Sequence, residues 1–149
     1  DIHSAQPLST ECRVWYGSRM RENRPRRVLV VDDEPKLRET VSAFLTERGH
    51  TVATATDGYD ALNQMGGFQP EIVLLDIAMP GLSGMDALEL LRARLMPPRV
   101  ILISGCDPDT QDVQHAFRQG VEAYVCKPFN LGTLDRLIAR VWPSESPPA

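Results

Sequence analysis

The sequence predicts an α/β protein with an open sheet of five parallel strands and helices on both faces. Five short apolar runs, several of them β-branched and unbroken, are typical of strands buried on both faces. Segments with apolar residues at helical spacing separate these runs, and such alternation implies right-handed crossovers within one sheet. The 149 residues are enough for one domain with a sizeable core and too few for two.

The first two strands are expected at residues 27–31 and 51–55, each followed by a helix. Pro35 suits the first turn of the first helix, and Gly49 is its stop. Asp57 is a candidate N-cap for the second helix. The apolar stripes of these helices are Leu37, Val41, Phe44 and Leu45, and then Tyr59, Leu62 and Met65.

The remaining three strands are expected at residues 71–75, 99–103 and 123–126. Pro97 and Pro98 must end the third helix, Gly120 closes the fourth, and Asn130 can cap the fifth. The stripes of these helices are Met85, Leu88, Leu91 and Leu95; Val113, Ala116 and Phe117; and Leu131, Leu134, Leu137, Ile138 and Val141.

The two ends of the chain differ in composition from the middle. Residues 1–26 show neither helical nor strand periodicity and are interpreted as a leader, flexible or partly tag-derived, because Gly17 and Ser18 precede Met20. Residues 27–142 form the predicted domain. Residues 143–149, rich in Pro and Ser, are interpreted as a tail or the stump of a linker.

Composition excludes several classes of function. The formal net charge is -4, and the only basic cluster, five arginines between residues 19 and 27, is interpreted as a solvated lead-in, so we expect no direct nucleic-acid binding. No run of 18 apolar residues and no signal peptide is present, so we expect no membrane insertion. Cys12, Cys106 and Cys126 lack CxxC spacing, which favours a reducing cytoplasm over a disulfide framework.

Polar side chains follow four of the five expected strands. Asp32, Asp33 and Glu34 follow the first, and single residues end the other three, namely Asp76, Ser104 and Lys127. In this architecture ligands bind beyond the carboxyl ends of the strands. Clustered carboxylates raise one another's pKa unless a cation joins them, and oxygen ligands without His or Cys favour Mg²⁺. With a metal present, an Asp oxygen can act as a nucleophile toward phosphorus.

These motifs together resemble those of the response-regulator receiver domain. The matching segments are residues 28–34 (VLVVDDE), 74–81 (LLDIAMPG) with Gly84 and Met85, Ser104, and residues 127–129 (KPF). The resemblance covers about residues 27–142. It implies a flavodoxin-like, doubly wound parallel sheet with strand order 2-1-3-4-5.

The resemblance also implies a role for each site residue. Asp76 would accept the phosphoryl group, and Mg²⁺ would be bound by Asp33, by Asp32 mainly through water, by Asp76 and by the backbone carbonyl of Ala78. Ser104 and Lys127 would hold the phosphoryl oxygens.

Two further residues match features of the receiver domain. The Lys-Pro bond before Pro128 is commonly cis in similar domains. Tyr124 occupies the place of an aromatic switch, which moves with the Ser and biases the surface of the fourth helix, fifth strand and fifth helix.

The leading hypothesis is a phosphorylation-dependent signalling switch. Its donor would be a histidine kinase or histidine phosphotransfer protein, its output protein is not identified by the sequence, and a homodimer through the fourth and fifth helices is compatible with the resemblance. No separate enzymatic turnover is expected. Three alternatives stay open: an excised receiver of a larger DNA-binding regulator or hybrid kinase, a metal-dependent phosphohydrolase with an aspartyl-phosphate intermediate, and a phosphorylation-independent interaction module.

Two positions depart from the commoner receiver pattern. Ala78 and Cys106 stand where many receivers carry polar side chains that shape water access, which leaves the lifetime of the phosphoaspartate open. The three histidines, His3, His50 and His115, are expected at the surface without a role in metal binding or phosphorylation.

Overall fold

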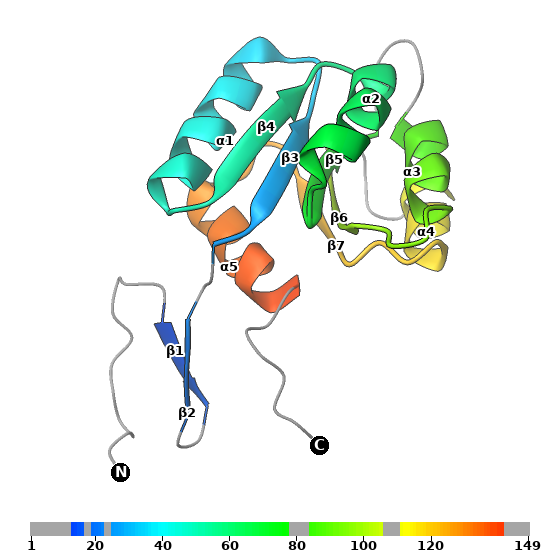
Figure 1. Ribbon diagram of the computed structural model, residues 1–149. Helices are drawn as coiled ribbons and strands as arrows, with labels where there is room; N and C mark the ends of the chain where they lie inside the picture. The colour runs from blue at the N-terminus through cyan, green and yellow to red at the C-terminus, as the bar shows by residue number, and fades with distance from the viewer. Residues whose placement is uncertain (1–12, 17–18, 23–24, 78–83, 106–110, 142–149) are drawn as a thin grey trace.

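The computed structural model describes residues 13–16, 19–22, 25–77, 84–105 and 111–141, and for 13–16 and 19–22 the backbone alone. Five parallel strands form one sheet with the order β4-β3-β5-β6-β7, which is 2-1-3-4-5 when these strands are counted along the chain. The predicted fold class is therefore confirmed. Figure 1 shows the sheet between two layers of helices.

The strands begin and end close to the predicted positions. They are β3 (Arg27–Val31), β4 (Thr51–Ala55), β5 (Ile72–Asp76), β6 (Arg99–Ser104) and β7 (Ala123–Cys126). β3 pairs with both β4 and β5, so the strand order reverses at β3. The central strands are buried almost throughout, as expected for a parallel sheet covered on both faces.

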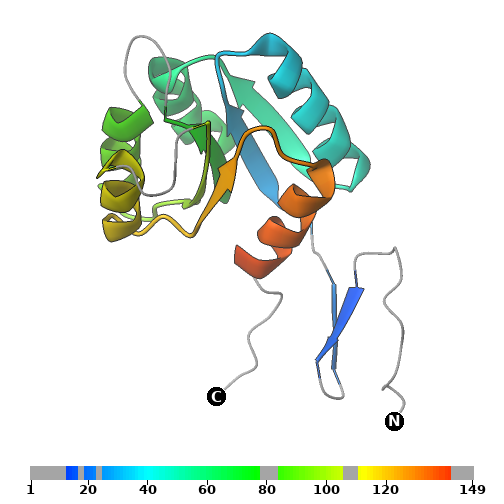
Figure 2. The same cartoon turned by 180° about the vertical axis from the view of Figure 1, so that it is seen from behind.

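Five helices cover the two faces of the sheet. They are α1 (Pro35–Glu47), α2 (Gly58–Phe68), α3 (Gly84–Arg92), α4 (Gln111–Arg118) and α5 (Leu131–Val141). The core beneath α2, α3 and α4 includes Leu75 and Leu88, whereas the core beneath α1 and α5 includes Leu74 and Leu134. Figures 1 and 2, seen from opposite sides, show α1 and α5 on one face and the other three helices on the other.

Local signals explain where several helices begin and end. Asp57 accepts a hydrogen bond from the Asp60 backbone N–H at 2.8 Å, and Asn130 accepts one from the Thr133 backbone N–H at 3.1 Å, so both predicted caps are present. Pro35 occupies the first turn of α1. Gly49 follows that helix with a φ of 98°, a backbone conformation that favours glycine.

Two expectations about local structure were wrong. Leu95 was assigned to the third helical stripe, but α3 ends at Arg92 and Leu95 is 99% exposed. Leu95 continues the apolar spacing of α3, but the helix has already ended before the Pro97–Pro98 pair, because the residue before a Pro disfavours the helical conformation. Within residues 1–26, β1 (Arg13–Tyr16) and β2 (Arg19–Glu22) pair antiparallel in a separate two-stranded sheet, which the absence of strand periodicity did not predict.

His50 was expected at the surface, and this was also wrong, because its exposed fraction is 4%. The ring lies in the turn between α1 and β4, where its Nδ1 accepts a hydrogen bond from the Arg26 backbone N–H at 3.0 Å. The His50 ring therefore accepts a hydrogen bond from the backbone N–H that directly precedes β3, a contact that its place in a turn did not indicate. His115, by contrast, is exposed on α4, and His3 lies outside the described residues.

Within the described ranges, no helix is both long enough and apolar enough to span a membrane.

Candidate functional site

The carboxyl edge of the sheet collects the polar residues that end its strands. Asp32 follows β3 directly, Asp76 is the last residue of β5, Ser104 is the last residue of β6, and Lys127 follows β7. Asp32, Asp76 and Ser104 are buried, whereas Asp33 is exposed. The site thus lies at the reversal of strand order, where an open parallel sheet offers its binding crevice.

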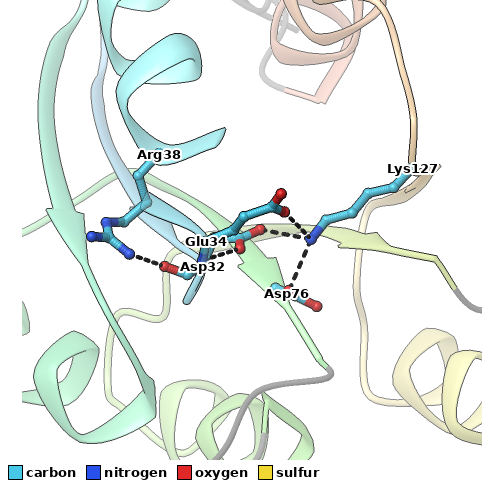
Figure 3. A network of polar contacts seen from close by, with 5 residues as sticks. All are labelled: Asp32, Glu34, Arg38, Asp76 and Lys127. Carbon is cyan, nitrogen blue, oxygen red and sulfur yellow. Dashed lines mark hydrogen bonds and ion pairs between the residues drawn. The ribbon is translucent and has the colours of Figure 1, made fainter. Parts of the chain in front are cut away.

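Lys127 joins the acidic residues of two strands. Its Nζ lies 3.1 Å from Oδ2 of Asp76 and donates a hydrogen bond to it. The same Nζ lies 3.0 Å from Oδ2 of Asp32 and 3.7 Å from Oε1 of Glu34. Figure 3 shows the ammonium between the three carboxylates. The backbone helps to place it, because the N–H of Lys127 donates to the carbonyl of Ser104 at 2.8 Å.

The environment of Lys127 keeps its ammonium charged. Burial lowers the pKa of Lys127, but the attraction of Asp32 and Asp76 outweighs burial, so the pKa is raised above its ordinary value. A charged lysine therefore stands at this edge across the physiological pH range. It is one cation facing several carboxylates.

Three carboxylates lie close enough together to share one cation. Asp32, Asp33 and Asp76 each offer an oxygen, and these atoms lie within 4.8 Å of one another. Oδ2 of Asp32 is buried, and among the described residues its charge is met by the ion pair with the Lys127 ammonium at 3.0 Å. A buried carboxylate oxygen beside two further carboxylates fits a metal ligand, and a set of oxygen donors fits Mg²⁺.

The other residues named from the sequence lie around this cluster or outside the described chain. Tyr124 is half-buried in β7 and packs against the core beneath α2, α3 and α4. The peptide bond between Lys127 and Pro128 is cis. Ala78 and Cys106 fall outside the described residues, so the structure does not place the expected carbonyl ligand or the loop after β6.

Sequence reasoning missed the part that Arg38 plays in this edge. Arg38 lies in α1, where its Nη1 donates a hydrogen bond to the backbone carbonyl of Asp32 at 2.7 Å. The signal was available in principle, since helical side chains point back toward the helix N-terminus and Arg38 lies about one turn after Glu34. Glu34 was noted among the strand-end acids, and no contact with Lys127 was assigned to it.

Comparison with known proteins links this geometry to one family. A family model described as the response regulator receiver domain matches residues 28–139. The DNA-binding response regulator MtrA of Mycolicibacterium smegmatis is 39% identical over 124 residues, which cover 83% of this chain and 54% of that protein. The transcriptional regulatory protein KdpE of Mycobacterium tuberculosis is 38% identical, over 76% of this chain and 48% of that protein. The chain thus spans about half the length of these relatives.

Solved structures show the same likeness. The response regulator protein TrrA of Thermotoga maritima, solved in complex with Mg²⁺-BeF, superposes with a TM-score of 0.68 at 32% identity, over 78% of this chain and 98% of that one. The chemotaxis protein CheY4 of Vibrio cholerae superposes with a TM-score of 0.73 at 26% identity, over 79% of this chain and 99% of that one.

Proposed function

The chain belongs to the response regulator receiver domain family, and from that premise we propose that it is a signalling switch phosphorylated on Asp76. The observation that carries the proposal is the surroundings of this carboxylate. It is buried at the end of β5, within 4.8 Å of the Asp32 and Asp33 oxygens and 3.1 Å from the Lys127 ammonium. An acid that only ends a strand or caps a helix does not require two further carboxylates and an ammonium beside it.

The chemistry of the switch follows from the charges at the edge. A carboxylate oxygen of Asp76 would attack the phosphorus of a phosphohistidine, forming a P–O bond while the P–N bond breaks and the imidazole leaves with its electron pair. Lys127 would shift its attraction from the carboxylates to the phosphoryl oxygens. Ser104, at the end of the neighbouring strand β6, would meet another of these oxygens.

Mg²⁺ is the cofactor that the acidic cluster fits. Asp32, Asp33 and Asp76 would hold it. The resemblance to receiver domains adds the backbone carbonyl of Ala78, which lies outside the described residues. The ion would neutralise negative charge as the phosphoryl group enters. Support comes from the closeness of the three carboxylates, which share the charge of Lys127, and from the TrrA complex, whose bound Mg²⁺-BeF belongs to that relative.

The output is a second proposal. A histidine kinase or histidine phosphotransfer protein would supply the phosphoryl group in the cytoplasm. Tyr124 would then reorient with Ser104 and change the surface formed by α4, β7 and α5, where an output protein or a second copy of the chain would bind. Because MtrA and KdpE are named as a DNA-binding and a transcriptional regulator, an output in transcription is the form that the relatives favour.

Labelling with acetyl phosphate tests the phosphoacceptor. The wild-type protein is incubated with Mg²⁺ and acetyl phosphate, and its intact mass is measured. We expect one phosphate adduct that depends on Mg²⁺ and that Asp76→Asn abolishes. Asp57→Asn is the matched control, because Asp57 also follows a strand but caps α2, so this variant should label like the wild type.

Two results would contradict the proposal. Absence of a Mg²⁺-dependent adduct on the wild type removes the function, and equal labelling of Asp76→Asn removes the site. The switch is tested separately by adding beryllofluoride and following the NMR signals of the Tyr124 ring. Unchanged signals in a protein that does bind beryllofluoride would remove Tyr124 from the mechanism.

A further inference from the structure

Arg38 makes a contact with the acidic edge that the proposed mechanism does not use. Its Nη1 donates to the carbonyl oxygen of Asp32 at 2.7 Å, and Figure 3 shows the guanidinium on the opposite side of Asp32 from Lys127. The side chain is half-buried and starts from the first turns of α1, where the Arg38 backbone N–H donates to the Glu34 carbonyl at 3.1 Å. A short bond from a charged donor is among the stronger hydrogen bonds in proteins.

The carbonyl that Arg38 binds belongs to the peptide joining Asp32 to Asp33. Two other hydrogen bonds hold the same turn: the Asp32 backbone N–H donates to the Ala55 carbonyl at 3.2 Å, and Oδ1 of Asp32 accepts from the Glu34 backbone N–H at 2.9 Å. The first tethers the turn to β4 and the second closes it on itself. Arg38 adds a bond from within α1 to the carbonyl of this peptide.

We propose that Arg38 is a positioning residue for the Mg²⁺ site: it fixes the Asp32–Asp33 peptide so that both carboxylates face Asp76. This inference rests on the proposed function, since it assumes that the acidic cluster takes Mg²⁺. The physical argument is that neighbouring acids repel one another and would turn apart if the peptide between them were free to rotate. A guanidinium on the carbonyl opposes that rotation without occupying a carboxylate oxygen.

A competing effect of Arg38 has the opposite sign. The guanidinium adds positive charge near the cluster, and through charge alone it would weaken the binding of a cation. Removing Arg38 therefore tightens Mg²⁺ binding if charge dominates and weakens it if positioning dominates. Partners that orient metal ligands typically change affinity by roughly 10–100-fold, which is large compared with the effect of one partly solvated charge.

The test compares three variants by calorimetric titration with MgCl₂. Arg38→Met keeps the length of the side chain and loses the donor, and we expect it to bind Mg²⁺ about tenfold more weakly than the wild type. Arg38→Lys restores one donor and should fall between them. Arg99→Met is the matched control, because Arg99 donates to the Val141 carbonyl at 2.8 Å on a different strand, so it loses the same kind of bond and should bind Mg²⁺ like the wild type.

A measurement without metal separates positioning from the proposed function. Hydrogen exchange of the Glu34 amide, whose acceptor is Oδ1 of Asp32, should be about tenfold faster in Arg38→Met and unchanged in Arg99→Met. If the wild type binds no Mg²⁺, the proposed metal site fails. If the wild type binds Mg²⁺ but Arg38→Met binds it equally or more tightly, or if Glu34 exchange is unchanged, the positioning role fails.

Discussion

The two ends of the sheet both gather buried charge, but they balance it differently. At the amino end, Arg26 pairs with Glu71 at 3.5 Å, and Arg48 pairs with Asp135 at 2.6 Å. Each of these two ion pairs joins one cation to one carboxylate. At the carboxyl end, the ammonium of Lys127 faces the carboxylates of Asp32, Glu34 and Asp76, and the guanidinium of Arg38 binds a backbone carbonyl instead of a carboxylate.

Each end also buries one polar side-chain atom that has no hydrogen-bond partner among the described residues. At the carboxyl end it is Oδ2 of Asp32, a negatively charged acceptor, and at the amino end it is Nε2 of His50. With Nδ1 of His50 accepting from Arg26, the proton of the neutral ring belongs on Nε2. The difference indicates that the amino end is structural, whereas the carboxyl end has an excess of negative charge that a bound cation would remove.

The largest expected effect comes from removing the central cation at the carboxyl end. Lys127→Met leaves the carboxylates of Asp32 and Asp76 without the ammonium. We expect the metal-free variant to be about 2–3 kcal/mol less stable than the wild type, because breaking a fully buried ion pair costs somewhat more than breaking one whose lysine is partly exposed. Mg²⁺ should then raise the Tm of this variant more than it raises the Tm of the wild type.

Arg48→Met is the control for that experiment at the amino end. It leaves Asp135 without the cation 2.6 Å away, so it should also lower stability. Its Tm should respond to Mg²⁺ as the wild type does. An equal response of the two variants to Mg²⁺ would mean that the two ends do not differ as we infer. Thermal unfolding followed by circular dichroism at several Mg²⁺ concentrations gives both quantities.

His50 should make the amino end sensitive to acid. Burial lowers the pKa of His50 below 6.5, and Arg26 and Arg48 act in the same direction, although Asp135 and Glu71 oppose them. As the pH falls, His50 is therefore protonated in the unfolded chain at a higher pH than in the folded protein. Stability is complete above about pH 6.5 and falls as the pH drops toward the folded pKa, at no more than about 1.4 kcal/mol per pH unit.

His50→Asn tests this assignment. An Asn side chain can still accept from the Arg26 N–H but does not titrate, so the variant should lose part of the pH dependence between pH 7 and 5. His115→Asn, on the exposed surface of α4, should keep the wild-type dependence. Urea unfolding at a series of pH values measures the slopes, and identical slopes for the wild type and His50→Asn would exclude His50 as the cause.

Asp57 sharpens the comparison within the carboxyl edge itself. It lies just beyond the end of β4, separated from it by Thr56, and its carboxylate accepts a hydrogen bond from the Asp60 N–H and caps α2. Asp57→Ala should cost about 1 kcal/mol of stability, the usual value for a lost N-cap, and should leave Mg²⁺ affinity unchanged. Weaker Mg²⁺ binding in this variant would show that the cation site is broader than the cluster of Asp32, Asp33 and Asp76.

The smallest expected effect on stability comes from Asp33→Asn, and it is a gain, whereas Lys127→Met and Asp57→Ala lose stability. Asp33 is the exposed member of the acidic cluster, and Asp33→Asn removes one negative charge from it. We expect a slight increase in the stability of the metal-free protein together with clearly weaker Mg²⁺ binding. Urea unfolding without Mg²⁺ and calorimetric titration with it measure the two changes, and lower stability without metal would argue against repulsion within the cluster.

The sequence by itself determined the order of elements, the five parallel strands and the edge at which Asp32, Asp76, Ser104 and Lys127 meet. Apolar periodicity, caps and turn residues act over a few neighbouring positions, and the handedness of crossovers then leaves few arrangements of the strands. The same local signals were insufficient at Leu95, where helical spacing continues after the helix has ended.

Only the tertiary structure decided which charged and polar side chains contact one another at the two ends of the sheet. The burial of His50 depends on a backbone donor 24 residues earlier, and Lys127 joins acids at the ends of two other strands. The bond from Arg38 to Asp32 depends on how α1 packs against the sheet. Such contacts form where packed elements meet. A sequence pattern can bring these residues to the same edge of the sheet, but the atoms that pair and the distances between them depend on how the elements pack.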